Sequence, residues 1–218
     1  MSVNSVINAK EHAYKEIKDQ ILKLKLIPGT KISEKLMSDQ LQVSRTPIRE
    51  AFLKLAQEEL LKIVPQSGTF VSLINLDYAR EAQFVREELE TAVILLSCEK
   101  ASKESLFNLE MNIKMQEGLA TDKFGLQQKE YFLNLDENFH KEFFELTEKQ
   151  RTWQMMQSIN GHLSRFRLLR LMSTSSLDWN ILIEQHKAIY TAVLEQDKFK
   201  AEKKIVEHLH LMLTEESI

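Results

Sequence analysis

Asp136 and His140 stand four positions apart in the segment LDENFHKEFF, a spacing that puts a carboxylate and an imidazole on one side of a helix. The apolar residues of the same region predict a buried stripe, and both polar side chains fall on its flank. A charged carboxylate inside a helical bundle is costly unless it is paired or bound to a metal ion. Partners are therefore expected on the inward faces of other helices.

Two more histidines meet this expectation, because His186 and His208 each fall on an apolar stripe at helical spacing. Together with Asp136 and His140 they form a set of nitrogen and oxygen donors suited to Zn, Ni, Mn or a similar divalent ion. Taken singly, each histidine is more typical of a hydrogen-bonded core residue than of a ligand. The joint placement of the four residues is what favours a metal centre.

The chain that must position these side chains has 218 residues, 43% of them hydrophobic and 28% charged, which is typical of a globular protein. A single cysteine excludes an internal disulfide framework, and no leader or membrane-length apolar run is visible, so we expect a cytoplasmic protein without a membrane segment. Residues 1–72 carry 11 Lys and Arg against 8 Asp and Glu, whereas residues 73–218 carry 18 against 24. This asymmetry predicts two domains, the first with a mildly basic face.

The N-terminal part predicts a winged helix-turn-helix. A first amphipathic helix stops at Pro28, a short second helix covers about 34–41, and Ser44 can cap a third. Two β-prone segments, 61–64 and 69–72, are separated by PQSG and predict a hairpin.

The remainder predicts an all-helical bundle of about six helices, one of them over 151–172, so the fold class is mainly α. We place the boundary between the two domains after residue 74, so that the winged helix-turn-helix domain covers residues 1–74 and the helical domain covers residues 75–218. The segment 73–77 is the expected hinge.

The third predicted helix has the features of a DNA reader. Thr46 and Arg49 point away from its apolar stripe, and Arg45 lies at its exposed N-terminal end, where arginine can bind guanine and the helix terminus favours phosphate. Gly68, at the tip of the hairpin, allows close approach of the backbone to the duplex. Two arginines on a solvated helix face are also common without any such function.

The run PGTKISEKLMSDQLQVSRTPIREAFLKLAQEELLKIVPQSGTFV resembles the DNA-binding domain of the GntR family of bacterial transcription regulators almost from end to end. In two places the chain departs from the family pattern, since Gln42 stands where Gly is usual and Ser38 where Ala is usual. The resemblance implies a winged helix whose DNA-contact positions are Lys35, Arg45, Thr46, Arg49 and Gly68.

The second half resembles the FCD ligand-binding domain of the FadR subfamily of these regulators, and its length is similar to that of the VanR-like group. Three segments, LDENFHKEFF, EQHKAIYTAV and VEHLH, match those in which metal-binding members carry one aspartate and three histidines. The resemblance implies as metal ligands Asp136, His140, His186 and His208.

Metal-containing relatives of this kind sense small organic acids or sugar acids, which implies a carboxylate effector at open metal positions with an arginine beside it. Arg86, in VREELE, and Arg165, in SRFRLLRLM, are the candidate effector-binding residues. Arg86 fits a salt bridge with Glu90 almost as well, and Arg167 and Arg170 are alternatives to Arg165.

The resulting hypothesis is a homodimeric, metabolite-responsive regulator, a repressor that an acid releases from a palindromic double-stranded DNA operator. No catalytic residues are predicted. A direct metal-ion sensor, an acyl-CoA sensor and a metal-dependent enzyme are the alternatives.

Overall fold

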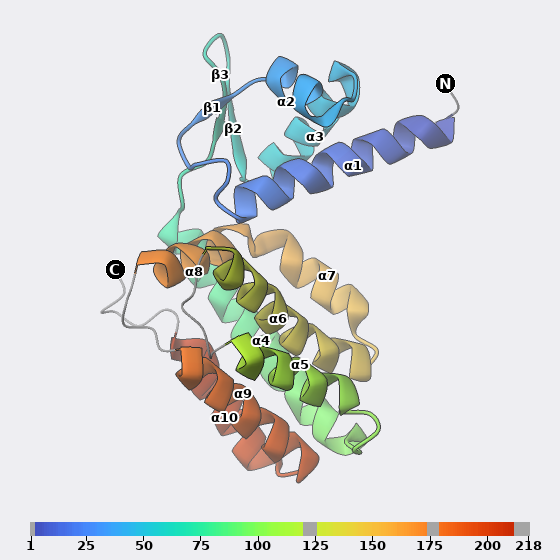
Figure 1. Ribbon diagram of the computed structural model, residues 1–218, viewed down its shortest axis with the longest axis vertical. Coiled ribbons are helices and arrows are strands. Elements are labelled where there is room, and N and C mark those ends of the chain that lie inside the picture. The colour runs from blue at the N-terminus through green and yellow to red at the C-terminus, as the bar shows by residue number, and fades with distance from the viewer. Residues whose placement is uncertain (1–2, 120–125, 174–178, 212–218) are drawn as a thin grey trace. The chain divides into compact units, whose positions relative to one another are not determined.

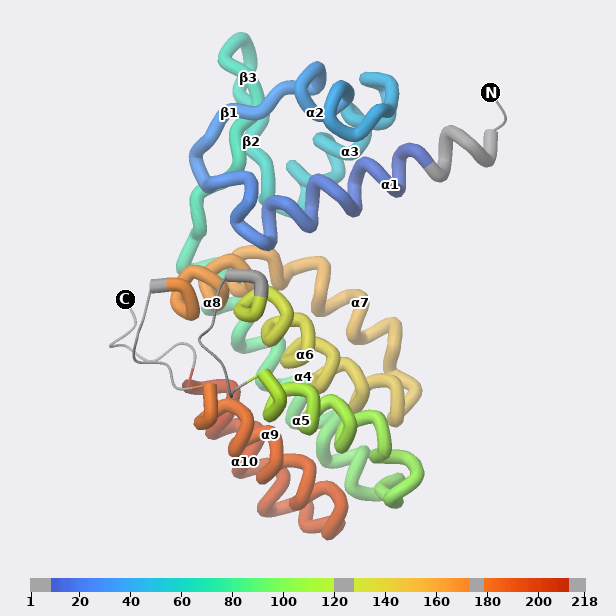
Figure 2. The backbone as a smooth tube through the Cα atoms, viewed as in Figure 1, coloured from blue at the N-terminus to red at the C-terminus, as the bar shows by residue number. Residues whose placement is uncertain are grey.

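The computed structural model describes residues 3–119, 126–173 and 179–211 of the chain (Figures 1 and 2). These residues form two compact units, an N-terminal unit of Met1–Ala79 with Gly161–Phe166 and a C-terminal unit of Arg80–Asn160 with Arg167–Ile218. The boundary between the two units therefore lies after Ala79. The N-terminal unit also includes a helical segment from much later in the chain. The predicted domain boundary at residue 74 remains a prediction.

The N-terminal unit contains the predicted winged helix-turn-helix. Its elements, which Figure 1 labels, are α1 (Val3–Leu22), β1 (Lys31–Ile32), α2 (Glu34–Leu41), α3 (Arg45–Gln57), β2 (Leu61–Val64) and β3 (Gly68–Val71). The strands form an antiparallel sheet in the order β1-β3-β2, in which Val64 pairs with Gly68 at the closed end of the hairpin. The two-residue strand β1 was not predicted, because it is too short to show an alternating pattern.

The core of this unit comes from the stripes that the sequence predicts. Helix α1 packs on α3, and the buried apolar residues include Ile17, Ile21, Ile48, Leu55 and Val71. Ser33 caps α2 through a hydrogen bond from Leu36 N, whereas Ser44 occupies the N-cap position of α3 without a side-chain hydrogen bond.

Both departures from the family pattern lie at the end of α2. Gln42 takes a left-handed conformation with φ of 56°, which glycine adopts more readily, and its Nε2 donates to Asp39 O at 2.6 Å. Ser38 Oγ donates to Val43 O, also at 2.6 Å. Local hydrogen bonds to the backbone thus hold the turn between α2 and α3 in this chain.

The C-terminal unit is all helical in its described residues. Its helices are α4 (Leu76–Lys100), α5 (Phe107–Leu119), α6 (Leu126–Leu146), α7 (Gln150–Ile159), α8 (Gly161–Ser173), α9 (Trp179–Leu194) and α10 (Lys198–His210), of which α4 and α8 begin in the N-terminal unit. Helix α6 packs against α5 and α7, and α9 packs against α5 and α10.

The single helix predicted over 151–172 is two helices, so the described chain has seven helices after the winged helix-turn-helix where six were predicted. The break follows Asn160, which ends α7. A Cβ added at Gly161 would lie 2.7 Å from Leu60 Cδ2, so close packing within the N-terminal unit requires glycine at the start of α8.

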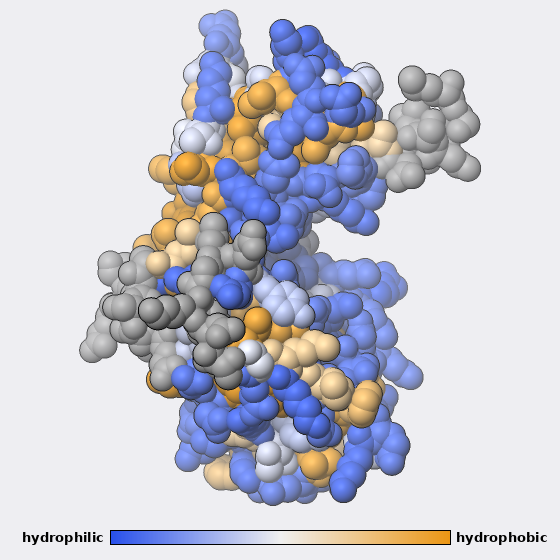
Figure 3. Space-filling model, viewed as in Figure 1, coloured by the Kyte–Doolittle hydropathy of each residue, from blue (hydrophilic) through white to orange (hydrophobic). Residues whose placement is uncertain are grey.

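Four of the five predicted members of the buried stripe of α6 are confirmed, since Phe132, Leu135, Phe139 and Phe143 are at most 6% exposed, whereas Leu146 is only half-buried. Full burial of each such side chain contributes roughly 1.5–3 kcal/mol. This stripe fixes the rotation of α6 about its axis and directs the polar residues on its flank into the bundle. Hydrophilic side chains cover much of the visible surface (Figure 3), and no helix in the described ranges combines the length and apolarity needed to span a bilayer.

Candidate metal centre and DNA-binding surface

Three helices bring the four predicted metal ligands together. Asp136 and His140 come from α6, His186 from α9 and His208 from α10. All four are buried, and one potential ligand atom from each lies within 4.8 Å of the others.

The separations between these atoms suit a single ion. His208 Nε2 lies 3.1 Å from His140 Nε2 and 3.3 Å from His186 Nε2, and Asp136 Oδ1 lies 3.5 Å from His186 Nε2 and 4.0 Å from His140 Nε2. Ligands about 2.0–2.1 Å from a tetrahedral zinc ion are about 3.4 Å from one another. The four side chains therefore already surround a space of the size that such an ion needs.

Each histidine turns its other ring nitrogen to an oxygen. His140 Nδ1 lies 2.6 Å from Glu90 Oε2, and His208 Nδ1 lies 2.9 Å from Gln185 Oε1. His186 Nδ1 lies 2.8 Å from Gln116 Oε1. For His186 and His208 this contact is a hydrogen bond, whereas the His140 contact meets only the distance of an ion pair. A ring whose Nδ1–H donates to oxygen keeps a lone pair on Nε2, and such outer partners orient histidine ligands in metal sites.

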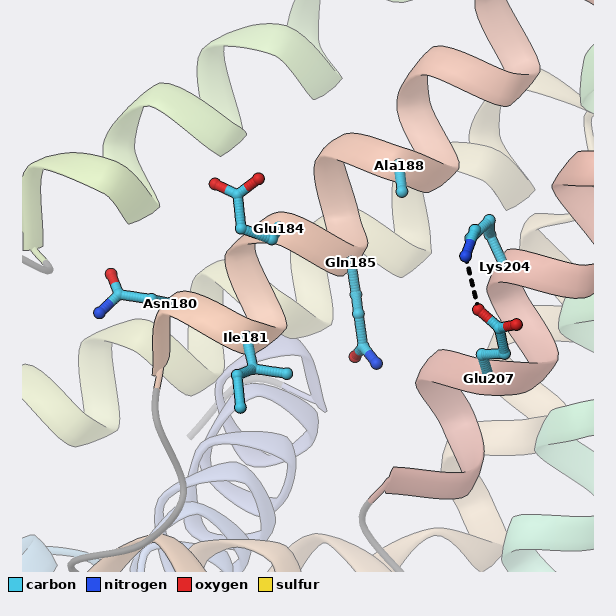
Figure 4. Close-up of a pocket in the computed structure, with 7 residues that line it drawn as sticks. All are labelled: Asn180, Ile181, Glu184, Gln185, Ala188, Lys204 and Glu207. Atoms are coloured by element: carbon cyan, nitrogen blue, oxygen red, sulfur yellow. Dashed lines mark hydrogen bonds and ion pairs between the residues drawn. The ribbon is translucent and has the colours of Figure 1, made fainter.

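Sequence reasoning missed these outer partners as parts of the site. Glu90 was considered only as a salt-bridge partner of Arg86, and no periodic signal distinguishes Gln116 or Gln185. Gln185 also lines a surface pocket of about 380 Å³ between α9 and α10, in which Lys204 and Glu207 form an ion pair at 2.7 Å (Figure 4). The side chain that bonds to His208 is therefore part of a surface pocket.

Asp136 is held in its charged form. Burial by itself raises the pKa of Asp136, but nearby positive charges, that of Arg167 foremost, outweigh burial and bring that pKa well below its ordinary value. Arg167 Nη2 donates to Asp136 Oδ2 at 2.5 Å, whereas Oδ1, on the side of the histidines, accepts no hydrogen bond from any described residue. A buried carboxylate oxygen left in this way is suited to bind a cation.

His186 and His208 are held in their neutral forms. Burial lowers the pKa of His186 to about 3, and burial together with the neighbouring imidazoles brings the pKa of His208 well below its ordinary value. Neutral imidazole is the form that binds metal. At neutral pH, His186 and His208 thus offer neutral imidazole nitrogens beside the charged carboxylate of Asp136, and these donors fit a divalent ion.

Arg86, a candidate effector-binding residue, is buried on α4, and its Nε donates to Glu90 Oε1 at 2.5 Å. The alternative of a salt bridge with Glu90 is therefore correct for this structure. Burial raises the pKa of Glu90, but Arg86 and His140 lower it to about 2 overall. Arg86 Nη2 has no hydrogen-bond partner within the described ranges.

Arg165, the other candidate effector-binding residue, makes its described side-chain contacts within the N-terminal unit. It is fully buried, and its Nη1 donates to Ser72 O at 2.6 Å within the N-terminal unit, while its Nη2 lies 3.1 Å from His162 Nδ1. Residues two positions apart on a helix point about 200° apart, so Arg167 is the arginine of α8 that faces Asp136. The contacts give no support for Arg165 as an effector ligand.

The predicted DNA-contact side chains Lys35, Arg45, Thr46 and Arg49 are all exposed. Arg49 has a partner that was not predicted, because its Nε lies 2.9 Å from Glu34 Oε1 and its Nη2 lies 3.0 Å from Glu34 Oε2. The hydrogen bond from Arg49 lowers the pKa of Glu34.

Gly68 has a structural reason to be glycine. Its φ is 125°, and a Cβ added there would lie 2.6 Å from Lys31 Cε. A larger residue would strain the backbone and displace Lys31 whether or not DNA is bound.

Comparison with known proteins identifies both parts of the chain. The pattern of the bacterial regulatory proteins of the gntR family matches residues 9–71, and that of the FCD domain matches residues 81–211. The chain belongs to the GntR family and carries an FCD domain. As a GntR-family protein it is a bacterial transcription regulator that binds DNA through its winged helix-turn-helix.

Individual relatives agree with this assignment. The GntR-family chain is 29% identical over 213 residues to the HTH-type transcriptional repressor RspR of Escherichia coli K12, covering 96% of this chain and 91% of RspR. It is 26% identical over 185 residues to the Nta operon transcriptional regulator of Aminobacter aminovorans, covering 84% and 82%. These relatives are regulators and not enzymes.

Solved structures support the fold alone. E. coli McbR/YncC matches the GntR-family chain with a TM-score of 0.78 at 19% identity, covering 93% of this chain and 94% of that chain. A GntR regulator from Rhodococcus sp. RHA1 matches with a TM-score of 0.73 at 18% identity, covering 92% and 93%.

Proposed function

We propose that this GntR-family regulator is a homodimeric repressor of the FadR subfamily, VanR-like group, that a small organic acid or sugar acid releases from a palindromic operator in the cytoplasm. The observation that supports the effector part is the buried centre, where three imidazole nitrogens and a carboxylate oxygen converge. The similarity to RspR, named a transcriptional repressor, supports repression.

The residues that would hold a divalent ion, Zn, Ni or Mn, are Asp136, His140, His186 and His208. When bound, the ion would supply Lewis-acidic positions for an effector carboxylate, because four protein ligands leave one or two positions of a five- or six-coordinate ion open. Arg86 and Arg167 are the cations of this region that could face such an acid. Arg167 thereby replaces Arg165 in the proposal.

DNA recognition is assigned to Lys35, Arg45, Thr46, Arg49 and Gly68. One winged helix reads one half-site, so a palindromic operator requires two copies of the chain. Arg49 is held by Glu34 in the free protein and would exchange this carboxylate for guanine or phosphate on binding.

The effector can act only if it binds one arrangement of the protein better than the other. Segment 73–77 is the proposed hinge. It directly follows Ser72, whose carbonyl is held by Arg165 of α8, and α8 also supplies Arg167 to the metal centre. A shift of α8 at Arg167 would therefore change the support of the hinge.

A direct metal-ion sensor is the second candidate function, and the burial of all four ligands favours it. In that case, occupancy of the centre by the ion would itself be the signal. A metal-dependent enzyme is not retained, because the relatives are regulators.

A thermal-shift screen of metal-loaded protein against sugar acids, hydroxy acids and dicarboxylates, repeated after chelation, tests the proposal. Bound ligand raises the free energy of unfolding by about 2.7 kcal/mol at a hundred times its Kd, so a genuine effector should shift Tm of the metal-loaded form alone. Operator binding should then weaken in the presence of that acid. If operator binding follows metal concentration and ignores every acid, the direct sensor is the correct reading.

A further inference from the structure

We infer that Asn112 and Gln116 of α5 are positioning residues of the metal centre: they hold His186 with its proton on Nδ1 and its Nε2 lone pair toward the other ligands. Helix α5 contributes no ligand, yet it places both amides in the interior, with Gln116 at 0% and Asn112 at 8% exposure. The inference rests on the proposed metal centre and names the residues that prepare it.

Three hydrogen bonds link the backbone of α6 to His186 through the two amides. The donor and the acceptor in each follow from the first bond, which Asn112 makes to the carbonyl of Leu135. Leu135 O can only accept, so Asn112 directs its amide nitrogen to it, with Nδ2 at 3.0 Å from that oxygen. Asn112 Oδ1 is then free to accept from Gln116 Nε2 at 2.7 Å. Gln116 must therefore present Oε1 to His186 Nδ1, at 2.8 Å, and only a protonated Nδ1 can donate to it.

The fixed tautomer matters because His186 has competing partners inside the centre. Its Nε2 lies 3.5 Å from Asp136 Oδ1 and 3.3 Å from His208 Nε2, and both of these atoms could accept a proton bound there. With the proton on Nε2, this N–H would donate a hydrogen bond to one of these atoms inside the centre. The metal would then have to displace that proton. Gln116 prevents this closed arrangement, so the centre stays ready for a cation.

His208 provides a contrast within the same centre. Its Nδ1 also faces an amide oxygen, that of Gln185, but Gln185 is half-buried and lines a surface pocket, where its amide could reverse (Figure 4). The amide of Gln116 is instead oriented by Asn112 and by the α6 backbone. His186 is thus the ligand whose tautomer the fold itself determines.

The test compares Gln116→Met, which keeps the length of the side chain but removes the acceptor, with the matched control Gln154→Met at an exposed position on α7. Affinity for Zn²⁺ is measured by competition with a chromophoric chelator, with Ni²⁺ and Mn²⁺ alongside. Loss of an outer partner weakens metal binding by roughly 10–100-fold, and we expect this loss for Gln116→Met and none for the control. In its protonated form the Glu of Gln116→Glu keeps both contacts, because its carbonyl oxygen accepts from Nδ1–H and its O–H donates to Asn112 Oδ1, so this variant should recover most of the affinity.

A second measurement is independent of metal and of activity. Nitrogen-15 shifts of the histidine rings in the metal-free protein should show His186 protonated on Nδ1 in the wild type and in Gln116→Glu, and on Nε2 in Gln116→Met. The wild-type spectrum alone tests the tautomer if a variant does not fold. An Nε2–H tautomer in the wild type, an unchanged tautomer in Gln116→Met, or unchanged Zn²⁺ affinity in Gln116→Met would each overturn the inference.

Failure of the metal centre itself gives a different result. Wild-type protein that binds none of the three ions overturns the proposed centre and with it the role of the two amides toward metal. The ring spectra would still show whether the amides control the His186 tautomer, so the two failures are distinguishable.

Discussion

Arg165 and Arg167 lie two positions apart on α8 and bind in different units of the chain. Arg165 Nη1 donates to Ser72 O at 2.6 Å in the N-terminal unit, and Arg167 Nη2 donates to Asp136 Oδ2 at 2.5 Å in the C-terminal unit. Helix α8 therefore carries one arginine that contacts the candidate metal centre and, two positions earlier, another that contacts the segment following the winged helix-turn-helix.

Replacing Arg167 should make the protein depend on metal for its stability. In Arg167→Met the charge of Asp136 loses its partner, and an uncompensated buried charge costs on the order of 3–5 kcal/mol. We expect a lower Tm without metal and a larger rise of Tm on addition of Zn²⁺ than in the wild type. Arg151→Met, at an exposed position of α7, is the control; equal Tm values for both metal-free variants would contradict the role of Arg167.

The variant Arg165→Met should show that Arg165 and Arg167 have different roles. Ser72 O loses a donor, so stability falls, but the metal ligands keep all their described contacts. Zn²⁺ affinity should therefore equal that of the wild type, while any effect of metal or acid on operator binding should diminish. A strong loss of Zn²⁺ affinity would show that Arg165 belongs to the centre after all.

Loss of a histidine ligand should reduce metal content without unfolding the protein. His186→Ala and His208→Ala each remove one of four donors, and the lost affinity should be on the order of 100-fold or more, beyond the effect of an outer partner. His210→Ala is a close control, because His210 is exposed and binds Glu87 at 2.8 Å. Full metal occupancy by elemental analysis in the two ligand variants would refute the centre.

Arg49 and Glu34 should have opposite effects on DNA binding. Arg49→Ala should cost roughly 1–3 kcal/mol of operator binding and relax specificity. Glu34→Gln should strengthen binding, because it frees Arg49 and removes a negative charge near the phosphates. Fluorescence anisotropy with operator and scrambled duplexes checks both, and weaker binding by Glu34→Gln would show that this carboxylate positions Arg49 for DNA.

His162 predicts how stability depends on pH. Burial and the neighbouring Arg165 lower the pKa of His162 to about 4. Arg165 Nη2 and the N–H of Asn75 both direct donors at Nδ1, and the Tyr78 ring packs edge-on against the imidazole. The unfolded chain takes up this proton near the ordinary pKa of about 6.5, so the unfolded state binds more protons between pH 6.5 and 4.

The free energy of unfolding should therefore fall as pH decreases through this window, by at most about 1.4 kcal/mol per pH unit for one group. In His162→Gln the amide oxygen can still accept from Asn75 N, and the dependence on pH should be weaker. Chemical denaturation at a series of pH values measures the slope. An identical slope in both proteins would assign the dependence to other groups.

Periodicity in the sequence was enough to predict the winged helix-turn-helix, the buried stripe of α6 and the inward faces that carry Asp136 and the three histidines. These features can be predicted because the spacing of residues close in sequence determines which side chains share one face of a helix. The sequence did not predict the break of the 151–172 helix, since Gly161 owes its place to packing against Leu60, far away along the chain.

Only the tertiary structure determined which atoms contact one another on the inward helix faces that the sequence predicted. It placed Arg167 beside Asp136 and Arg165 beside Ser72, paired Arg49 with Glu34, and brought Gln116 to His186. The physical reason is that helical periodicity fixes the rotation of each helix about its own axis, whereas hydrogen-bond partners depend on how separate helices pack. The sequence by itself thus indicated the family and the four residues that could hold a metal ion, and packing determined which atoms of those residues meet.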